Sequence, residues 1–320
     1  MTGTGLVTLG ETMAALAPDR IGPLRHASTL GLAVAGSEST VAIGVRRLGH
    51  PAAWIGRVGA DELGELVTSR LRAESVTVHA TADPAAPTGL MLKERRTAAL
   101  RRVHYYRAGS AGSRLTPADL PAGLIESADL LHATGITPAL SDTAAASVRT
   151  AIDRAHAASV PVSYDLNHRN RLWSWEEARA FTLPLLPRIS LLFASEDEAE
   201  LLLGHEPGAH SAETLAQELR KLGPETVVIT MGADGAVAAD SSGTTRISAV
   251  PVPEIDPVGA GDSFVAGYLA ALLSGADPGE RLDQAARVAA WSVATEGDWE
   301  GLPTAAELPL TAAPPGTVAR

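Results

Sequence analysis

The segment PEIDPVGAGDSFVAGYLAALLSG, residues 253–275, carries the clearest structural signal in the chain. Its second half predicts a helix, because apolar residues from Phe264 to Leu273 recur at helical spacing and Gly275 follows as a stop. The small residues at 259–261 therefore lie at the start of this helix, where the first backbone N–H groups have no partner within the helix. Together with the helix dipole, these amides form a place suited to a phosphate.

Asp262 lies at the mouth of this predicted anion site. A carboxylate at the start of a helix has an ordinary interpretation as a helix cap. The alternative is a general base beside a bound phosphate. The whole pattern D-x-V-G-A-G-D-x-F, which begins at Asp256, is more specific than a glycine-rich turn and favours the second interpretation.

Short apolar runs alternate with amphipathic stretches along the chain. Strands are predicted at residues 6–10, 52–59, 127–135, 160–166, 189–195 and 226–232. Helices are predicted at residues 38–48, 61–74, 141–158, 196–203 and 211–222. The strands are too apolar to be buried on one face only, which indicates a central, mainly parallel sheet. The chain is thus predicted to have a doubly wound α/β fold with helices on both faces.

Two segments interrupt this alternation. Residues 13–36 contain prolines and glycines, and residues 88–107 alternate between apolar and charged side chains. Period-two alternation predicts exposed strands, so we expect the two segments to form a small β lid. The lid would be inserted into a main domain of residues 1–12, 37–87 and 108–308, and residues 309–320 would be a flexible tail. Edge hairpins without a function remain the alternative.

Composition narrows the class of protein. The chain has 320 residues, 45% of them hydrophobic, a formal net charge of −11 and no cysteine. The lack of cysteine excludes disulfides, thiolate nucleophiles and cysteine-ligated metals, and the acidity argues against nucleic acid as a partner. Because we find neither a basic N-terminal segment nor a long apolar run, we expect no signal peptide, no membrane span and a cytoplasmic location.

Other nucleotide- and metal-dependent enzymes have motifs that the sequence lacks. A dinucleotide-binding dehydrogenase would show G-x-G-x-x-G directly after the first strand, but that strand ends in LGETMA. Neither G-x-x-x-x-G-K-[ST] nor H-E-x-x-H occurs. A P-loop enzyme and a zinc hydrolase are therefore disfavoured.

A second motif, AGSESTVAIGVRRLGHPAAWIGRVGADELGE at residues 35–65, precedes the glycine segment at a characteristic distance. In these two motifs the chain resembles the ribokinase-type (PfkB) carbohydrate kinases, and the resemblance runs from Gly10 to about Pro303. It implies transfer of the γ-phosphoryl group of ATP to a sugar hydroxyl, with Mg²⁺ and optionally K⁺ as cations. Phosphoryl transfer depends mainly on positioning and charge stabilisation, which suits an anion site without a covalent nucleophile.

The resemblance also assigns roles to individual residues. Asp262 would be the base, and Gly259, Ala260 and Gly261 would stabilise the migrating phosphoryl group. Glu198 would organise Mg²⁺ through water, and Asp256 would bind a monovalent cation. Residues implied in ATP binding are Asn167, Ser195, Thr230, Gly232, Gly235, Gly259, Gly261 and Ala286. Simpler interpretations are an acid in the first turn of a helix for Glu198, and a plain turn between strands for 230–235.

Four phrases resemble the branch of the family that phosphorylates 2-keto-3-deoxygluconate. They are RRVHYYRAGSAGSRLTPADL (101–120), HATGITPALS (132–141), DLNHRNRLWS (165–174) and GDWEG (297–301). The substrate residues implied are Gly36, Ser37, Thr40, Met91, Tyr106, Arg107, Arg169 and Asp262. Arginine suits the carboxylate of an acid sugar, although surface salt bridges are the simpler interpretation of both arginines.

The chain departs from the family pattern at several of these places. Ala35, Thr40 and Met91 replace polar or glycine residues of the sugar site, and Ser195 and Ala286 replace asparagines of the nucleotide site. The galactonate epimer, a neutral ketose and a nucleoside therefore stay open as substrates, and so does a sugar-binding regulator on a decayed kinase fold. The alternating lid strands also predict a homo-oligomer.

Overall fold

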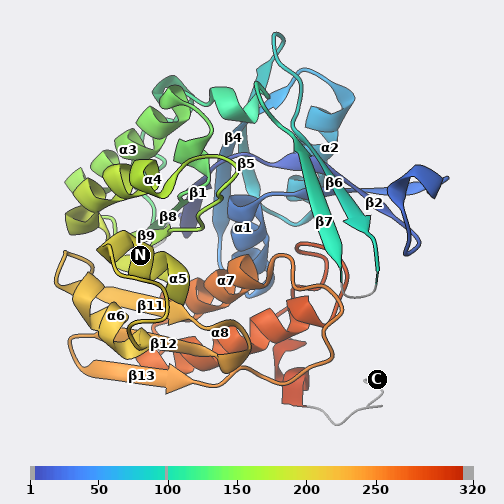
Figure 1. Ribbon diagram of the computed structural model, residues 1–320. Helices are drawn as coiled ribbons and strands as arrows, with labels where there is room; N and C mark the ends of the chain where they lie inside the picture. Colours follow the sequence, from blue (N-terminus) through green and yellow to red (C-terminus); the bar gives the residue numbers. More distant parts are fainter. Residues whose placement is uncertain (1–3, 98–99, 313–320) are drawn as a thin grey trace.

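The computed structural model describes residues 4–97 and 100–312, which form a large sheet flanked by helices and a smaller second sheet (Figure 1). Within these residues the large sheet has nine strands in the order β13-β12-β11-β10-β9-β8-β1-β4-β5. The strands are β1 (Leu6–Leu9), β4 (Ala52–Gly59), β5 (Thr77–Asp83), β8 (Leu130–Thr134), β9 (Val162–Asp165), β10 (Leu191–Ser195), β11 (Thr226–Thr230), β12 (Ala236–Asp240) and β13 (Gly243–Ile247). All neighbours pair in parallel from β5 to β11, whereas β12 and β13 are antiparallel additions at one edge.

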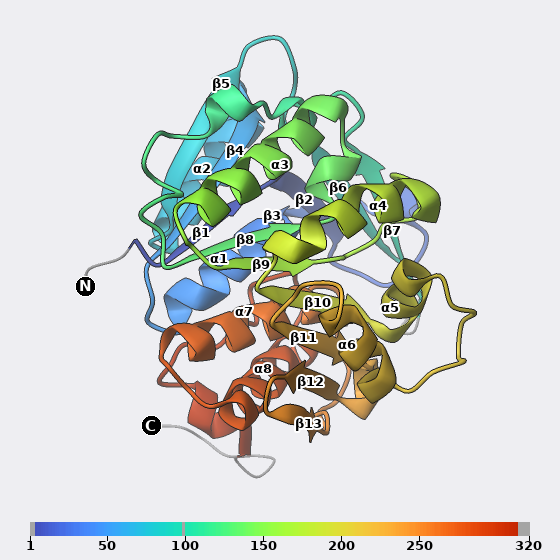
Figure 2. The ribbon, with the colours of Figure 1, turned by 90° about the vertical axis from the view of Figure 1, so that its left-hand side faces the viewer.

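Helices cover both faces of this sheet (Figure 2). One face packs against α1 (Ser37–Arg47), α2 (Glu62–Ala73), α7 (Ala260–Leu273) and α8 (Pro278–Val293). The other packs against α3 (Asp142–Ala157), α4 (Trp175–Thr182), α5 (Glu196–Leu203) and α6 (Ala212–Arg220). Short 3-10 helices are η1 (Leu24–His26), η2 (Gly112–Arg114), η3 (Pro117–Asp119), η4 (Thr137–Ala139), η5 (Leu183–Arg188), η6 (Gly232–Asp234) and η7 (Leu308–Ala312). The prediction of a doubly wound, mainly parallel α/β fold is confirmed.

The small sheet has the order β3-β2-β6-β7. Its strands are β2 (Met13–Pro18), β3 (Leu30–Ala35), β6 (Leu90–Arg95) and β7 (Arg101–Tyr106), all within the two segments expected to form a lid. Two antiparallel hairpins are joined by the parallel pair β2–β6. One face buries Met13, Ala15, Ala35 and Met91 in a small cluster of their own. The sheet is thus anchored by one face, and its action as a lid stays a prediction.

The C-terminal segment is described as far as residue 312. Residues 308–312 form η7, where Trp291 Nε1 donates a hydrogen bond to Thr311 Oγ1 at 2.7 Å. The rest of the tail predicted to be flexible, 313–320, lies outside the described residues. In the part of the chain that the structure describes, no helix combines the length and apolarity needed to cross a bilayer.

Candidate active site

The edge of the sheet at the carboxyl ends of its strands holds the candidate site. The chain runs from β1 to β4 on one side and later returns to β8 on the other, so the connections diverge beside β1. Such a switch point leaves a crevice outside the sheet, where α/β proteins bind ligands. The cleft here is lined from separate parts of the chain by Glu11, Ser37, Met91, Arg169 and Asp262.

The glycine turn at the head of α7 supplies unpaired backbone donors to this cleft. Gly259 is the N-cap and has φ +82°, and a Cβ atom there would lie 2.4 Å from the carbonyl oxygen of Asp298. Only glycine fits this combination of backbone angle and close approach. Within the described chain, the backbone amides of Gly261 and Asp262 have no hydrogen-bond partner. The predicted anion site therefore has its donors in place at the head of α7.

The carboxylate of Asp262 is oriented through one of its two oxygens. Oδ1 accepts hydrogen bonds from Ser37 Oγ at 2.5 Å and from Asn167 Nδ2 at 3.3 Å, and Asn167 Nδ2 also donates to Ser37 Oγ at 3.0 Å. No hydrogen bond from the described residues reaches Oδ2. One oxygen thus fixes the side chain, while the other is left without a protein partner on a residue that lines the cleft.

The surroundings of Asp262 make it a better base than an ordinary aspartate. Burial raises the pKa of its carboxyl group above the usual 3.8, and the negative charge of Asp298 acts in the same direction. The hydrogen bonds from Ser37 and Asn167 and the positive charge of Arg169 oppose the rise without cancelling it. The pKa is therefore displaced upward, which is the direction that favours a general base.

This balance predicts the acid side of the pH profile. As the predicted general base, Asp262 must be a carboxylate to act, so kcat/KM is expected to fall as the pH drops through its raised pKa, above the usual 3.8. Replacing Arg169 by methionine removes a charge that lowers this pKa, so the pKa rises and the acid limb moves to higher pH. Steady-state profiles of kcat/KM against pH for the wild type and for Arg169→Met measure the shift of the acid limb. A limb that stays in place or moves to lower pH would contradict the arrangement.

Two further acids interact electrostatically at this edge of the sheet: Asp165 at the end of β9 and Glu198 in the first turn of α5, which follows β10. Glu198 Oε1 accepts from the backbone N–H of His168 at 2.7 Å, and Oε2 accepts from that of Ser195 at 2.8 Å. Glu198 therefore caps α5 and also holds the loop after β9. Burial raises the pKa of Asp165 well above its usual value, and the negative charges of Glu198 and Asp262 add to the rise.

This acid pair is the feature that fits a magnesium ion. A divalent cation relieves the mutual repulsion of the carboxylates, and Mg²⁺ binds through waters and phosphate oxygens with few direct protein ligands. The described residues contain no cluster of three or more histidine, cysteine, aspartate or glutamate side chains that could hold a metal ion. Asp165 was not among the predicted site residues. Its position at the end of a predicted parallel strand was the available signal.

The predicted substrate residues divide into two groups. Gly36, Ser37, Met91, Arg107 and Arg169 line the cleft together with Asp262. Thr40 does not reach the cleft, because it is buried within the first turn of α1.

Tyr106 also lies away from the cleft, and the preceding residue, Tyr105, lines the cleft instead. It is 64% exposed and pairs with Leu90, on the face of the small sheet opposite to Met91. Tyr105 pairs with Met91 and lines the cleft instead. Successive side chains of a strand point to opposite faces, so a shift of one residue exchanges inside for outside.

The two predicted substrate arginines differ in their partners. Arg107 donates from Nε to Glu11 Oε2 at 2.6 Å, and Ser110 Oγ also donates to this buried carboxylate. The charge of Arg107 is thus compensated from within the protein. Arg169 is exposed in the cleft and forms no ion pair with a described residue. Of the two, Arg169 is the one available to an anionic ligand.

The residues predicted to bind ATP come from several elements of the main domain. Ser195 and Thr230 pair in register at the ends of β10 and β11. Gly232 and Gly235 have positive φ angles of +55° and +96° in the turn that leads into antiparallel β12, so the simpler interpretation as a turn also holds. Ala286 is buried inside α8, and Asn167 contacts Asp262 as described above. Their contacts with a nucleotide stay predictions.

Taken together, the doubly wound sheet, the glycine turn and the oriented carboxylate define the ribokinase-like class of small-molecule kinases. The chain belongs to the pfkB family of carbohydrate kinases, whose family model matches residues 4–305.

Named relatives agree with this assignment. The chain is 39% identical over 308 residues to a 2-dehydro-3-deoxygluconokinase of Thermoproteus tenax, covering 94% of this chain and 92% of the relative. It is 34% identical to a 2-dehydro-3-deoxygalactonokinase of Haloferax volcanii, covering 92% of each. Its fold is similar to that of a putative ribokinase II of E. coli solved with ATP and Mg²⁺, with a TM-score of 0.88, 24% identity and coverage of 96% and 98%.

Proposed function

We propose that the protein transfers the γ-phosphoryl group of ATP to 2-keto-3-deoxygluconate and forms its 6-phosphate. The single observation that carries the proposal is the open Oδ2 of Asp262, next to unpaired amides of α7 in a cleft that also exposes Arg169. The names of the relatives from Thermoproteus tenax and Haloferax volcanii, both kinases for acid sugars, support the choice of substrate class.

In the proposed reaction the protein positions the reactants and stabilises charge. MgATP supplies the transferable phosphoryl group when it is bound. Arg169 binds the carboxylate of the sugar, and Asp262 accepts the proton of the attacking hydroxyl as the bond to phosphorus forms. The amides of Gly261 and Asp262 stabilise the negative charge of the phosphoryl oxygens. The small sheet covers the sugar and excludes water, which limits hydrolysis of ATP.

Arg169 is predicted to set the preference for an acid sugar. Replacing it by methionine keeps most of the volume but removes the charge, so KM for 2-keto-3-deoxygluconate is expected to rise roughly 10–100-fold, the usual size of a lost charge-assisted contact. The KM for ATP should change little. Arg188, which pairs with Asp153 away from the cleft, provides the matched control. An Arg169→Met enzyme with an unchanged KM for the acid sugar would contradict this role.

A coupled ADP-release assay tests the proposed function directly. The substrates are 2-keto-3-deoxygluconate, its galactonate epimer, fructose, ribose and adenosine. We expect the highest kcat/KM with one of the two acid sugars. A clear preference for a neutral ketose or a nucleoside would overturn the substrate assignment. Sugar binding without any ADP release would instead favour a non-catalytic regulator.

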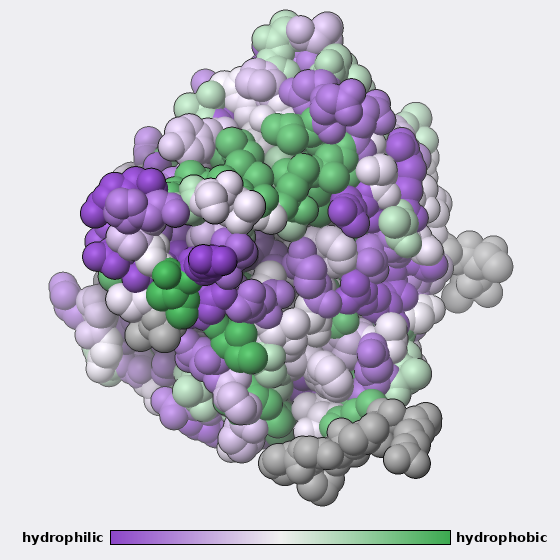
Figure 3. Space-filling view, turned by 90° about the vertical axis from the view of Figure 1, so that its right-hand side faces the viewer, coloured by the Kyte–Doolittle hydropathy of each residue, from purple (hydrophilic) through white to green (hydrophobic). Residues whose placement is uncertain are grey.

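The proposal includes a homo-oligomer formed through the small sheet. Figure 3 shows hydrophobic side chains gathered on the face of the molecule that carries this sheet. Leu30 and Leu32 of β3 are 40% and 48% exposed. An exposed apolar face on a small sheet is a typical site of subunit contact. The cytoplasmic location expected from the sequence stays a prediction.

A further inference from the structure

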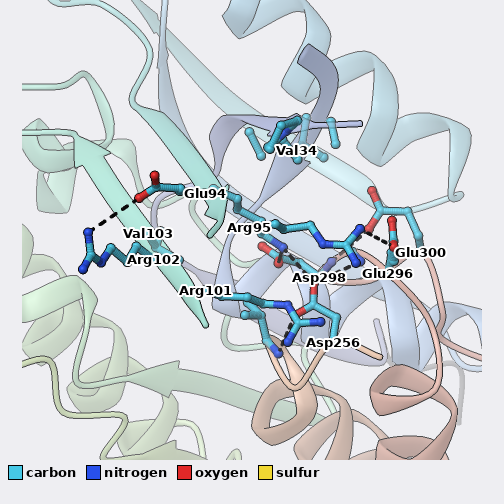
Figure 4. A pocket seen from close by; sticks show the side chains of 17 residues that line it. Val34, Glu94, Arg95, Arg101, Arg102, Val103, Asp256, Glu296, Asp298 and Glu300 are labelled. Carbon is cyan, nitrogen blue, oxygen red and sulfur yellow. Dashed lines mark hydrogen bonds and ion pairs between the residues drawn. The ribbon is translucent and has the colours of Figure 1, made fainter. Parts of the chain in front are cut away.

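A compact ion cluster lies between the small sheet and the glycine turn (Figure 4). Lys93 of β6 donates a hydrogen bond from Nζ to Asp298 Oδ1, and the same Nζ lies 3.7 Å from Asp256 Oδ2. Arg101 of β7 approaches Asp256 from the other side, with Nε 3.5 Å from Oδ1. Register in the β6–β7 hairpin places Lys93 and Arg101 on the same face of the small sheet, so both reach toward the main domain.

The carboxylate of Asp256 is surrounded by donors. Besides the two cationic side chains, it accepts from the backbone N–H of Val258 at 3.2 Å and from that of Gly297 at 3.5 Å. A K⁺ ion needs several oxygen ligands. The ammonium group of Lys93 already lies 3.7 Å from Asp256 Oδ2, and its positive charge would repel a K⁺ ion bound to this carboxylate. The monovalent cation that the family resemblance implies at Asp256 therefore does not fit this cluster.

The cluster is buried enough for its charges to matter. The side chains of Lys93, Asp256 and Asp298 are 13%, 9% and 11% exposed. The ammonium group of Lys93 faces the carboxylates of both Asp298 and Asp256, so it has a negative charge on each side. Without this ammonium, Asp298 would lose its ion-pair partner among the described residues, and Asp256 would keep only Arg101.

The two carboxylates flank the turn that forms the anion site. Asp256 directly precedes residues 257–261, and the backbone carbonyl of Asp298 lies so close to Gly259 that a Cβ atom would be 2.4 Å away. The segment around Asp298 is itself held by Glu300, whose Oε2 accepts from the backbone N–H groups of Asp298 and Trp299. A cation that bridges Asp256 and Asp298 thus ties both sides of the turn together.

We infer that the Lys93 ammonium group is a built-in cation, which holds the glycine turn from the small sheet and makes the kinase independent of added K⁺. Lys93 is a positioning residue, because it contacts the two carboxylates and does not line the cleft that holds Asp262. Its effect on the reaction runs through the geometry of the α7 amides. The inference rests on the proposed kinase activity for its rate measurements and on the fold alone for its melting measurements.

The test compares wild type with Lys93→Met at constant ionic strength. Tetramethylammonium chloride is replaced stepwise by KCl or NH₄Cl up to about 100 mM, so that screening stays fixed. Wild-type kcat is expected to change less than about twofold. Lys93→Met should lose roughly 10–100-fold in kcat in tetramethylammonium, the effect of a slightly misplaced site, and K⁺ or NH₄⁺ should restore most of it. Lys93→Arg should keep more activity than Lys93→Met.

Melting temperatures provide a readout that needs no substrate. KCl is expected to stabilise Lys93→Met and to leave the wild type unchanged, because only the variant has room for a cation between the carboxylates. The matched control is Arg95→Met, on the same face of the small sheet, whose partner Glu296 is 63% exposed. This control should behave as wild type in both measurements.

Three results would overturn the inference: a wild-type enzyme that requires KCl, a Lys93→Met enzyme as fast as wild type in tetramethylammonium, or a folded but slow variant that neither cation restores. If Lys93→Met does not fold, the response of the wild type to KCl decides alone. Failure of the proposed function is separate, since it would appear as absence of ADP release by the wild type in every salt.

Discussion

Replacing Asp262 by asparagine is expected to lower kcat by roughly 10²–10⁴-fold, the usual size of the loss of a general base. The amide keeps the shape of the side chain and can still contact Ser37 and Asn167, but it cannot accept the hydroxyl proton. ATP binding should remain close to that of wild type, because the backbone amides of α7 are unchanged. Steady-state rates and a nucleotide-binding titration together measure the two effects.

A helix cap is the competing interpretation of Asp262, and a second aspartate controls for it. In the structure the N-cap of α7 is Gly259, and the Asp262 side chain makes no capping hydrogen bond. Asp277 is a true cap, since its Oδ1 accepts from the backbone N–H of Glu280 at 2.9 Å at the start of α8. Asp277→Asn should therefore change stability slightly and kcat hardly at all. Near-normal turnover of Asp262→Asn would remove Asp262 from the catalytic role.

The parallel inner strands of the central sheet were predictable because they carry their signal locally, whereas the inner antiparallel strand β12 was not predicted. Runs such as 189–195 are apolar on both faces, and they correspond to strands such as β10 that are buried almost throughout. The edge strands β5 and β13 escaped prediction for the opposite reason. Their residues, Thr77–Asp83 and Gly243–Ile247, are mostly half-exposed or exposed and contain few large apolar side chains. An edge strand forms because it pairs with a neighbouring strand. This long-range pairing cannot be seen in the local sequence pattern.

The candidate site also contains residues with a local sequence signal and residues that only long-range packing brings together. Asp262 and the glycine turn were predictable because the turn, the carboxylate and the helix are adjacent in sequence. The contacts of Arg107 with Glu11, and of Lys93 with Asp298, join residues that are 96 and 205 positions apart. Sequence alone indicated that charged side chains alternate on the lid strands. Which of them would meet a buried carboxylate, and which would stay available to substrate, was decided by the packing of the small sheet.

Gly259 should be the least replaceable residue of the turn. Alanine there would adopt a φ of +82°, which costs roughly 1–2 kcal/mol, and its Cβ would lie 2.4 Å from the carbonyl oxygen of Asp298. The turn must shift to relieve this contact, so the α7 amides leave their positions and kcat is expected to fall roughly 10²–10³-fold, as when an oxyanion donor is lost. Thermal melting should show a clear loss of stability as well.

Replacing Gly261, two positions further along the turn, separates the effect of backbone strain from that of losing the anion site. A Cβ atom on Gly261 would meet no other heavy atom within 4 Å, and its φ lies outside the left-handed region. Gly261→Ala should therefore melt close to wild type, while Gly259→Ala melts at a lower temperature. If both alanine variants had wild-type stability, the close contact between Gly259 and Asp298 could not exist in solution. The turn would then have no fixed geometry from which to hold a phosphoryl group beside Asp262.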